Sequence, residues 1–469
     1  MVESGPYFGG RLSRREFVKR GGAGLMGAML LGASGCGGNG ASTKKRTNVE
    51  GSKTLVKGEG GGEEVVFWTS FTGPVDVASL TKIVKKFNEQ SKDATVTMVQ
   101  VPGDETDVSK LMTAVRGGVG PDVYHLDRFT ASERAADGVL QPLDQYVDPG
   151  MGDRYLKFAW DEVLYEDKPY ALPFDTDVRA LFYRRDMLQD AGINPDELDA
   201  KNGPISVERL TEIASAVDET KGNSYSKIGF IPWFDQGFHY TWGFDFGGSF
   251  FDKESCEVTP TDPNVVEAFQ VMFYDWAEGK GPDKIQEFID TYYPPPEPPP
   301  AQNPFLTGRL ALVVSGDFFI PIIQDYGKNT DYGITYLPLP EGRDEPTTWS
   351  GGWSAVIPQG AKSPEAAYEF ASFLCGEEAQ RMYVKQTQHL PTLQSLQTEE
   401  DLYTEEHKFF KDLLPVSKSR PPLPVGAQYF DELTAAQESV TLNQEKPEEA
   451  LQGVKDTVDQ RLERYCPIK

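Results

Sequence analysis

The chain has 469 residues and a formal net charge of −26. A field of that sign repels nucleic acids and anionic lipids, so neither is expected as a partner. The length is sufficient for two domains with a large core. Four histidines are scattered and no Cys-x-x-Cys pair occurs, so we predict no metal ion and no cofactor.

The N-terminus has the pattern of an export signal. Arg14 and Arg15 precede an apolar stretch at 23–33, which is shorter than the roughly 20 residues of a membrane-spanning helix. A basic start, a short apolar core and small residues at the exit are typical of a cleaved signal peptide, here residues 1–35. The arginine pair resembles the twin-arginine export signature. An anchor helix that is never cut is the alternative.

The exit sequence Ala33-Ser34-Gly35-Cys36 resembles a bacterial lipobox. The resemblance implies that Cys36 is lipidated and that the protein is exported and anchored to the outer face of the cell membrane. Residues 36–62 are rich in glycine and almost free of apolar side chains. They are therefore predicted to be a flexible tether.

Three further cysteines, Cys256, Cys375 and Cys466, would then lie in an oxidising compartment. One disulfide with one free thiol fits that compartment. The sequence leaves the pairing open.

The first folded segment alternates between strands and helices. Apolar runs and polar–apolar alternation predict strands, and apolar residues at helical spacing predict helices. The expected elements are a strand at 64–68, a helix at 77–87, a strand at 95–101, a helix at 108–115 and a strand at 121–127. This order predicts a mainly parallel sheet with helices on its faces.

Ligands of such sheets bind beyond the carboxyl ends of the strands. That rule selects Trp68, Thr69 and Ser70 after the first strand. It also selects Asp127 and Arg128 after the third strand.

A second unit begins near Pro173, because proline fixes its own backbone and restricts the residue before it. A strand at 178–183 and helices at 207–217 and 265–276 are expected to follow. Between these helices, residues 230–251 are crowded with aromatic side chains that glycines separate. They predict either a loop-rich wall of a cleft or a buried aromatic cluster.

The run Pro294–Pro300 consists of prolines around one glutamate. It is expected to be an exposed, extended polyproline spacer.

Several segments, in this order and spacing, resemble the extracellular solute-binding proteins of ABC importers, of the maltose-binding type. The segments are Leu111–Asp127, Leu172–Ile193, Phe305–Asp317, Trp349–Pro358, Ser363–Phe373 and Leu390–Thr392. The resemblance covers roughly residues 63–465. The polyproline run and the aromatic segment depart from the family pattern.

The resemblance implies an α/β fold of two lobes, the type II periplasmic-binding-protein arrangement, with three crossovers between the lobes. The crossovers are expected within the second, third and fourth of these segments. The first lobe would comprise residues 63–172 and 315–348, and the second lobe residues 173–314 and 349–469.

The resemblance also implies that particular residues bind the ligand. Aromatic rings stack on the apolar face of a sugar, and carboxylates select its hydroxyl groups. The predicted ligand-binding residues are Trp68, Thr69, Ser70, Asp127, Arg128, Phe174, Asp175, Asp177, Trp233, Asp317, Gly352 and Trp353.

The function implied is capture of a small extracellular solute, above all a mono- or oligosaccharide, between the lobes. The solute would be delivered to the permease subunits of an ABC importer by a monomeric binding protein that is not an enzyme. A lipid-anchored glycoside hydrolase is one alternative, and it needs two carboxylates about 5–10 Å apart. A surface adhesion or sensor module is another.

The ligand could also be a polyol or a glycerophosphate. A phosphate group would require Arg or Lys in the cleft, and Arg128 and Arg179 leave that alternative open.

Overall fold

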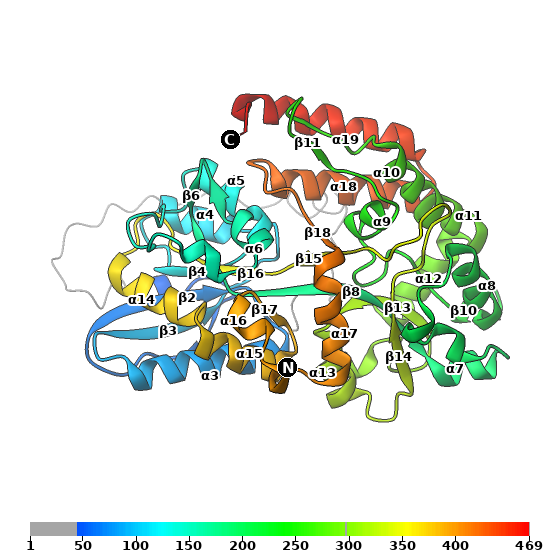
Figure 1. Cartoon of the computed structure of the whole chain (residues 1–469), viewed down its shortest axis with the longest axis horizontal. Coiled ribbons are helices and arrows are strands. Elements are labelled where there is room, and N and C mark those ends of the chain that lie inside the picture. Colours follow the sequence, from blue (N-terminus) through cyan, green and yellow to red (C-terminus); the bar gives the residue numbers. More distant parts are fainter. Residues whose placement is uncertain (1–44, 296–297, 469) are drawn as a thin grey trace, which may run out of the picture.

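The computed structural model describes residues 45–295 and 298–468, and the expected signal peptide and Cys36 lie outside them. Two mixed β-sheets form two lobes that lie side by side (Figure 1). No helix in this described part of the chain is both long enough and apolar enough to span a bilayer.

The first sheet has the strand order β1-β3-β2-β4-β16-β7. Strands β2, β3 and β4 are parallel and carry the predicted alternation, with helices between them. The strands are β1 Lys53–Val56, β2 Glu63–Thr69, β3 Ala94–Gln100, β4 Val123–Asp127, β7 Ala171–Pro173 and β16 Trp353–Val356. The helices of this lobe are α3 Pro74–Gln90, α4 Ser109–Arg116, α5 Ala131–Ala136, α6 Lys157–Asp161, α14 Pro364–Leu374 and α15 Glu377–Thr387.

The second sheet is built around one long buried strand, β8. Strands β13, β14, β15 and β17 pair antiparallel with it, and β18 runs parallel to β15. The strands are β8 Asp175–Arg184, β13 Leu312–Gly316, β14 Tyr332–Thr335, β15 Thr348–Gly351, β17 Leu390–Pro391 and β18 Ser417–Ser419.

The helices of the second lobe include the two that the sequence predicts. Helix α8 has the predicted bounds, and the helix expected at 265–276 is found as α10, a π-helical stretch at 269–275 and the start of α11. The helices are α7 Arg185–Asp190, α8 Val207–Val217, α9 His239–Asp245, α10 Pro263–Ala268, α11 Trp276–Lys280, α12 Pro282–Tyr292, α13 Phe319–Tyr326, α16 Gln394–Gln397, α17 Glu405–Leu413, α18 Gly426–Thr441 and α19 Pro447–Leu462.

Each sheet is covered on both faces by a hydrophobic cluster. Along β2, Val65 and Phe67 pack into one cluster of the first lobe, and Val66 and Trp68 pack into the other. Successive strand residues point to opposite faces, so a strand buried on both faces reads as a continuous apolar run.

The strand pairing corrects the expected division into lobes. Residues 315–348 were expected in the first lobe, but β13 and β14 pair with β8 in the second sheet. Strand β16 pairs instead with β4 and β7 of the first sheet. Helices α14 and α15 pack on the same core, so roughly residues 352–388 belong to the first lobe.

The chain crosses between the sheets at three places. Two of them lie within predicted segments, between β7 and β8 and between β15 and β16. The third lies between α15 and β17, near His389. The segment Phe305–Asp317 is not a crossover, because its strand β13 stays paired with β8 and leads into α13 of the same lobe.

The expected tether also needs a correction, because part of residues 36–62 is folded. Strand β1 pairs antiparallel with β3. Arg46 is buried, forms an ion pair with Asp122, and accepts a hydrogen bond at its carbonyl from the indole of Trp68 (2.9 Å).

A disulfide joins Cys256 to Cys466 across 210 residues of sequence, and Cys375 is a buried free thiol. The bond attaches the C-terminal segment to the hairpin of β11 (Phe251–Asp252) and β12 (Glu257–Val258).

We predict that Arg46→Ala lowers the free energy of unfolding by about 3–5 kcal/mol, because it leaves the buried carboxylate of Asp122 without its cation. Denaturant unfolding of the mature protein measures this. Lys45→Ala is the matched control, since Lys45 is exposed. Equal stability of the two variants would contradict a structural role for this segment.

Candidate functional site

The carboxyl ends of β2 and β4 lie side by side in the first lobe, as the parallel pairing requires. Thr69 and Ser70 are buried there. The Thr69 hydroxyl lies 3.4 Å from Nδ1 of His125, and the His125 ring stacks on Trp353 at the start of β16, with 5.1 Å between centroids. This edge of the first sheet faces the second lobe.

Asp127, at the end of β4, forms an ion pair that crosses between the lobes. Arg420, which follows β18, donates from Nη2 to both carboxylate oxygens of Asp127, at 2.8 and 3.1 Å. The Arg420 guanidinium also lies over the ring of Phe129 (3.7 Å). Its Nε and Nη1 are buried and have no hydrogen-bond partner in the described chain.

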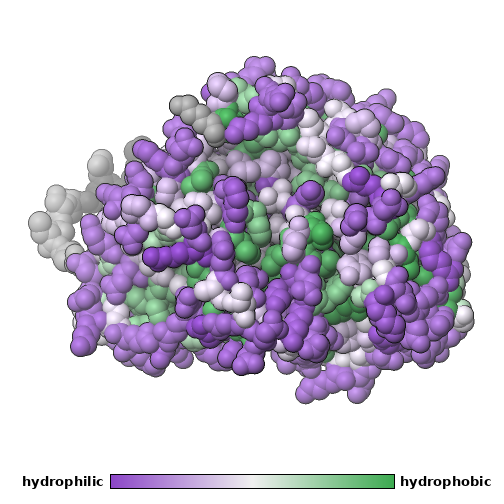
Figure 2. Space-filling view, viewed as in Figure 1, coloured by the Kyte–Doolittle hydropathy of each residue, from purple (hydrophilic) through white to green (hydrophobic). Residues whose placement is uncertain are grey.

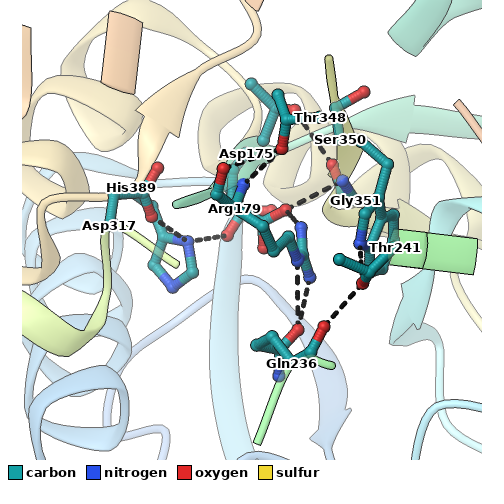
Figure 3. Close-up of polar contacts among 12 residues, drawn as sticks. Asp175, Arg179, Gln236, Thr241, Asp317, Thr348, Ser350, Gly351 and His389 are labelled. Atoms are coloured by element: carbon teal, nitrogen blue, oxygen red, sulfur yellow. Dashed lines mark hydrogen bonds and ion pairs between the residues drawn. The ribbon is translucent and has the colours of Figure 1, made fainter. Parts of the chain in front are cut away.

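A second buried arginine, on β8, lies among the polar side chains drawn in Figure 3. Arg179 on β8 pairs with Asp177 and donates to the side-chain oxygen of Gln236 from Nε (3.1 Å) and Nη2 (2.8 Å). Its guanidinium lies 3.6 Å above the ring of Trp349. Arg420 lies 4.9 Å from the same ring, so both arginines are in contact with Trp349.

A histidine at the third crossing lies among three carboxyl groups. Nδ1 of His389 is 3.6 Å from Asp317 and 3.8 Å from Asp175, and Nε2 is 3.7 Å from Asp76. These are ion-pair distances rather than hydrogen bonds. Both oxygens of Asp317 are buried without a hydrogen bond from the described chain. Figure 3 shows Asp317 and Asp175 on either side of the imidazole.

The pKa values of His389 and of the carboxyl groups near it are set by burial and by their mutual attraction. Burial alone would lower the pKa of His389, but the three carboxyl groups outweigh it and raise that pKa to about 10. Burial raises the pKa of Asp175 to about 6 and that of Asp317 well above its usual value. Burial opposes ionisation of Asp177 too, but Arg179 and His389 reverse the effect and lower its pKa.

Glu105, in the loop between β3 and α4, is a half-buried carboxyl group of the first lobe. Burial, followed by repulsion from Asp127, raises the pKa of Glu105 to about 7, against the attraction of Arg420 and Arg179.

Together these side chains form what we call the interlobe cluster, in which carboxyl groups outnumber cationic side chains. Within residues 45–295 and 298–468, no group of three or more His, Cys, Asp or Glu side chains is arranged to hold a metal ion. The members of the cluster are Asp76, Asp127, Asp175, Asp177, Arg179, Gln236, Asp317, Trp349, His389 and Arg420.

Thr69 and Ser70 are buried at the end of β2, where the Thr69 hydroxyl lies beside His125. Four of the sequence-predicted residues belong to the cluster, namely Asp127, Asp175, Asp177 and Asp317. Trp353 adjoins them, since its backbone N–H donates to Asp175 (2.6 Å) and its ring contacts Phe71 (4.6 Å).

Four of the predicted residues have structural roles instead. Trp68 is fully buried in the first lobe with its indole N–H already bonded, because it points to the face of the sheet opposite Phe67. Phe174 packs in the core of the first lobe against Tyr383 (4.6 Å). Arg128 and Gly352 belong to the hinge and are occupied by backbone contacts.

Trp233 is half-buried and packs against both hydrophobic clusters of the second lobe. The aromatic segment 230–251 is mostly buried, so the prediction of a buried aromatic cluster describes it better than a loop-rich wall. Phe238 and Phe318 are half-buried rings beside the interlobe cluster, at 6.5 Å from Trp349 and 5.3 Å from His389.

Sequence reasoning missed the partners that come from distant segments. Arg420 lies 293 residues from Asp127, and no local pattern marks it. His389 directly precedes the segment Leu390–Thr392 that the family resemblance includes, which is the one signal that could have found it. Arg179 was considered only as a phosphate ligand, whereas the structure pairs it with Asp177.

Further contacts close the two lobes on each other. Ala427 at the start of α18 donates its backbone N–H to Glu133 on α5 (2.6 Å), and Arg461 on α19 pairs with the same carboxylate (3.2 Å). The Thr106 hydroxyl donates to Asp431 (2.9 Å). Figure 1 shows α18 extending from the second lobe toward α5. The interlobe cluster is therefore enclosed between the hinge and these helices.

Comparisons with known proteins agree with this architecture. A family model described as bacterial extracellular solute-binding protein matches residues 82–411. The galactooligosaccharide-binding protein of Bacillus subtilis is 23% identical over 79% of this chain and 83% of its own length. The maltotriose-binding protein of Pyrococcus abyssi is 22% identical over 67% of this chain and 63% of its own length.

Solved structures show the same fold. CpMnBP1 with mannobiose bound has a TM-score of 0.76 and 20% identity, over 85% of this chain and all of that one. The GacH receptor of Streptomyces glaucescens has a TM-score of 0.69 and 24% identity, over 86% of this chain and 99% of its own. The two-lobed fold predicted from the sequence is thereby confirmed.

The charge on His389 predicts a specific loss of stability at alkaline pH. An unfolded histidine titrates near 6.5. Because the folded pKa is raised to about 10, the stabilisation is complete below 6.5 and is lost as the pH rises toward 10. The free energy of unfolding of the wild type, measured with denaturant, should therefore fall between about pH 7 and about pH 10. His389→Gln should remove that dependence.

His407→Gln is the matched control for this measurement. Burial lowers the pKa of His407 to about 3. The stability that its neutral form provides is therefore lost as the pH falls from 6.5 toward 3, and not at alkaline pH. The control should keep the alkaline slope of the wild type. An alkaline slope that survives in His389→Gln would contradict the assignment.

Proposed function

We propose, since the chain belongs to the bacterial extracellular solute-binding proteins, that its interlobe cluster binds a mono- or oligosaccharide. The bound sugar would be delivered to the permease subunits of an ABC importer. The ligand class is inferred from Asp317, a fully buried carboxyl group beside His389 whose two oxygens accept no hydrogen bond from the described chain.

Sugar hydroxyls suit this site because each can donate one hydrogen bond and accept others. They can donate to Asp317 and Asp175, and they can accept from Nε and Nη1 of Arg420. The half-buried rings of Phe318 and Phe238 lie beside these groups and offer apolar faces to a pyranose. The relatives named above carry names or ligands of the same chemical class.

A phosphate-bearing ligand fits less well. Arg179 is paired with Asp177 and Arg420 with Asp127, so each guanidinium is already neutralised. The cationic ring of His389 is likewise shared by Asp175 and Asp317, at 3.8 and 3.6 Å, so each cationic side chain of the cluster already has a carboxyl partner. The charge balance therefore favours a neutral ligand over a glycerophosphate.

The site is proposed to bind its sugar without cleaving it. Asp127 and Asp177 are each held by an arginine, and Asp175 and Asp317 lie 3.8 and 3.6 Å from Nδ1 of His389. A hydrolase would need one carboxyl group free to protonate the leaving oxygen and a second free to attack or to activate water.

Lipid anchoring is proposed from the sequence alone. The lipobox-like Ala33–Cys36 follows a short apolar stretch and a pair of arginines. By that resemblance a lipid on Cys36 would hold the binding lobes near a permease in the membrane.

Calorimetric titration of the mature chain with mannobiose, mannotriose, maltotriose, galacto-oligosaccharides, mannitol and glycerol 3-phosphate tests the proposal. Binding of at least one sugar class with no released product is expected. Binding of glycerol 3-phosphate alone, or release of a shorter sugar, would contradict it.

Asp317→Asn should weaken binding of that sugar by roughly 10- to 100-fold, because a charge-assisted hydrogen bond contributes about 1.5–3 kcal/mol. Thermal unfolding should be recorded for the same variant to show that it is folded. Asp290→Asn, an exposed change on α12, is the control and should bind like the wild type. Equal affinities of the two variants would remove Asp317 from the site.

A further inference from the structure

One carboxylate of the first lobe is bound by the second lobe outside the interlobe cluster. Glu133 lies on α5, and its Oε2 accepts hydrogen bonds from the backbone N–H groups of Ala427 (2.6 Å) and Gln428 (3.3 Å) at the start of α18. Its Oε1 lies 3.2 Å from Arg461 on α19. We call these contacts of Glu133 with Ala427, Gln428 and Arg461 the latch.

The start of α18 is a suitable partner for a carboxylate. The first N–H groups of a helix have no partner within the helix, and they carry a partial positive charge. Val425, the residue before α18, provides no side-chain cap. Glu133 takes the place of a local capping residue, although it lies 294 residues from Ala427 and belongs to the other lobe.

The partners of Glu133 are all protein groups. Both of its carboxylate oxygens are occupied, and its side chain is only 3% exposed. Both oxygens of Asp317 in the interlobe cluster, by contrast, lack a hydrogen bond from the described chain. The latch therefore needs no sugar in order to form, and Glu133 is placed to act on the lobes rather than on the ligand.

Arg461 is held firmly in the second lobe. Its Nη1 donates to the side-chain oxygen of Gln428 (3.2 Å), and its Nη2 lies 3.5 Å from Asp137, directly after α5. The disulfide between Cys256 and Cys466 ties the chain just beyond α19 to the turn between β11 and β12. The latch thus joins a fixed part of the second lobe to α5 of the first.

The latch is polar and can therefore be broken and remade. Figure 2 shows that this face of the molecule is largely hydrophilic, with smaller groups of hydrophobic side chains between. Arg461 is already 31% exposed, so water reaches the edge of the latch. When the lobes part, water can replace the hydrogen bonds of Glu133.

We propose that Glu133 is a positioning residue that holds the lobes closed and thereby sets the rate at which a bound sugar leaves. The proposal rests on the proposed function and describes a regulation of the same site. A sugar enclosed between the lobes leaves only after they part, so a contact made only in the closed form slows dissociation. Association begins from the open form, in which the latch is absent.

The latch also acts before the sugar arrives. Because it consists of protein groups alone, it increases the population of the closed arrangement in the ligand-free protein. A larger closed population raises the apparent affinity for a ligand that the closed form holds. The shape of the ligand-free protein is therefore a readout that requires no sugar.

Small-angle X-ray scattering of the ligand-free mature chain tests this first consequence. The proteins are the wild type, Glu133→Ala, Arg461→Ala and the control Glu365→Ala, an exposed change on α14. Glu133→Ala should have a larger radius of gyration than the wild type. Arg461→Ala should lie between the two, since the N–H groups of α18 still bind Glu133, and the control should match the wild type.

Stopped-flow mixing of the same proteins with a sugar that binds gives the two rate constants. Glu133→Ala should release the sugar roughly tenfold faster than the wild type, because it loses hydrogen bonds to a charged group. Its association rate constant should stay within about twofold of the wild type. Thermal unfolding shows which variants are folded, and Arg461→Ala serves as the test if Glu133→Ala is not.

An unchanged radius of gyration or an unchanged release rate in Glu133→Ala would overturn the proposal while leaving sugar binding by the wild type intact. Affinity that is lost through slower association would overturn it too, because that pattern indicates a damaged site rather than a lost latch. If no sugar binds to the wild type, the proposed function fails and the effect on sugar release fails with it. The scattering of the ligand-free proteins would then still show whether Glu133 holds the lobes closed.

Discussion

The buried guanidinium of Arg128 joins two of the three connections between the lobes. It donates to the carbonyl of Asp175 at the first crossing and to that of Gly351 at the second (2.5 Å), and it pairs with Glu162 (2.8 Å). Buried carbonyl groups require such donors, and a buried guanidinium requires a compensating carboxylate. The interaction therefore fixes the two strands from which the interlobe cluster is built.

The backbone at the second crossing depends on the same interaction. Gly352 has a φ of +135°, and a Cβ there would overlap Arg128 and the carbonyl of Asp175. Only glycine is compatible with both the left-handed backbone and the close approach. With the crossings held in this way, Asp175 and Asp177 at the start of β8 are aligned beside Trp353 and opposite Asp317. The hinge thus determines where the carboxyl groups of the site lie.

Closure of the lobes places charged groups in an environment with little water. A buried ion pair such as Asp127 with Arg420 contributes little net stability, because desolvation offsets the attraction. Polar atoms that remain unsatisfied, on Asp317, Arg420 and His389, add to that cost. A ligand that supplies hydroxyl groups to these atoms would recover it, so binding and closure are coupled.

The sequence was sufficient to predict the three parallel strands of the first sheet, the two-lobed fold and the four carboxyl groups Asp127, Asp175, Asp177 and Asp317 of the cluster. Local periodicity determines strands and helices, and the carboxyl ends of β2 and β4 follow from their parallel order. Trp68 and Phe174 were wrongly predicted to bind the ligand. Strand alternation turns the side chain of Trp68 into the core of the first lobe, and Phe174 packs in that core beside the crossing between β7 and β8. Arg420 could not be predicted, because its position depends on a contact across 293 residues, and His389 was marked only by its place before the segment Leu390–Thr392.

A crystal structure of the mature chain with the sugar that binds most tightly tests the central claim most directly. The account predicts a sugar enclosed between the sheets, with a hydroxyl group within hydrogen-bond distance of Asp317 and another near Arg420. A sugar bound on the outer surface of either lobe, with the interlobe cluster unchanged, would contradict it.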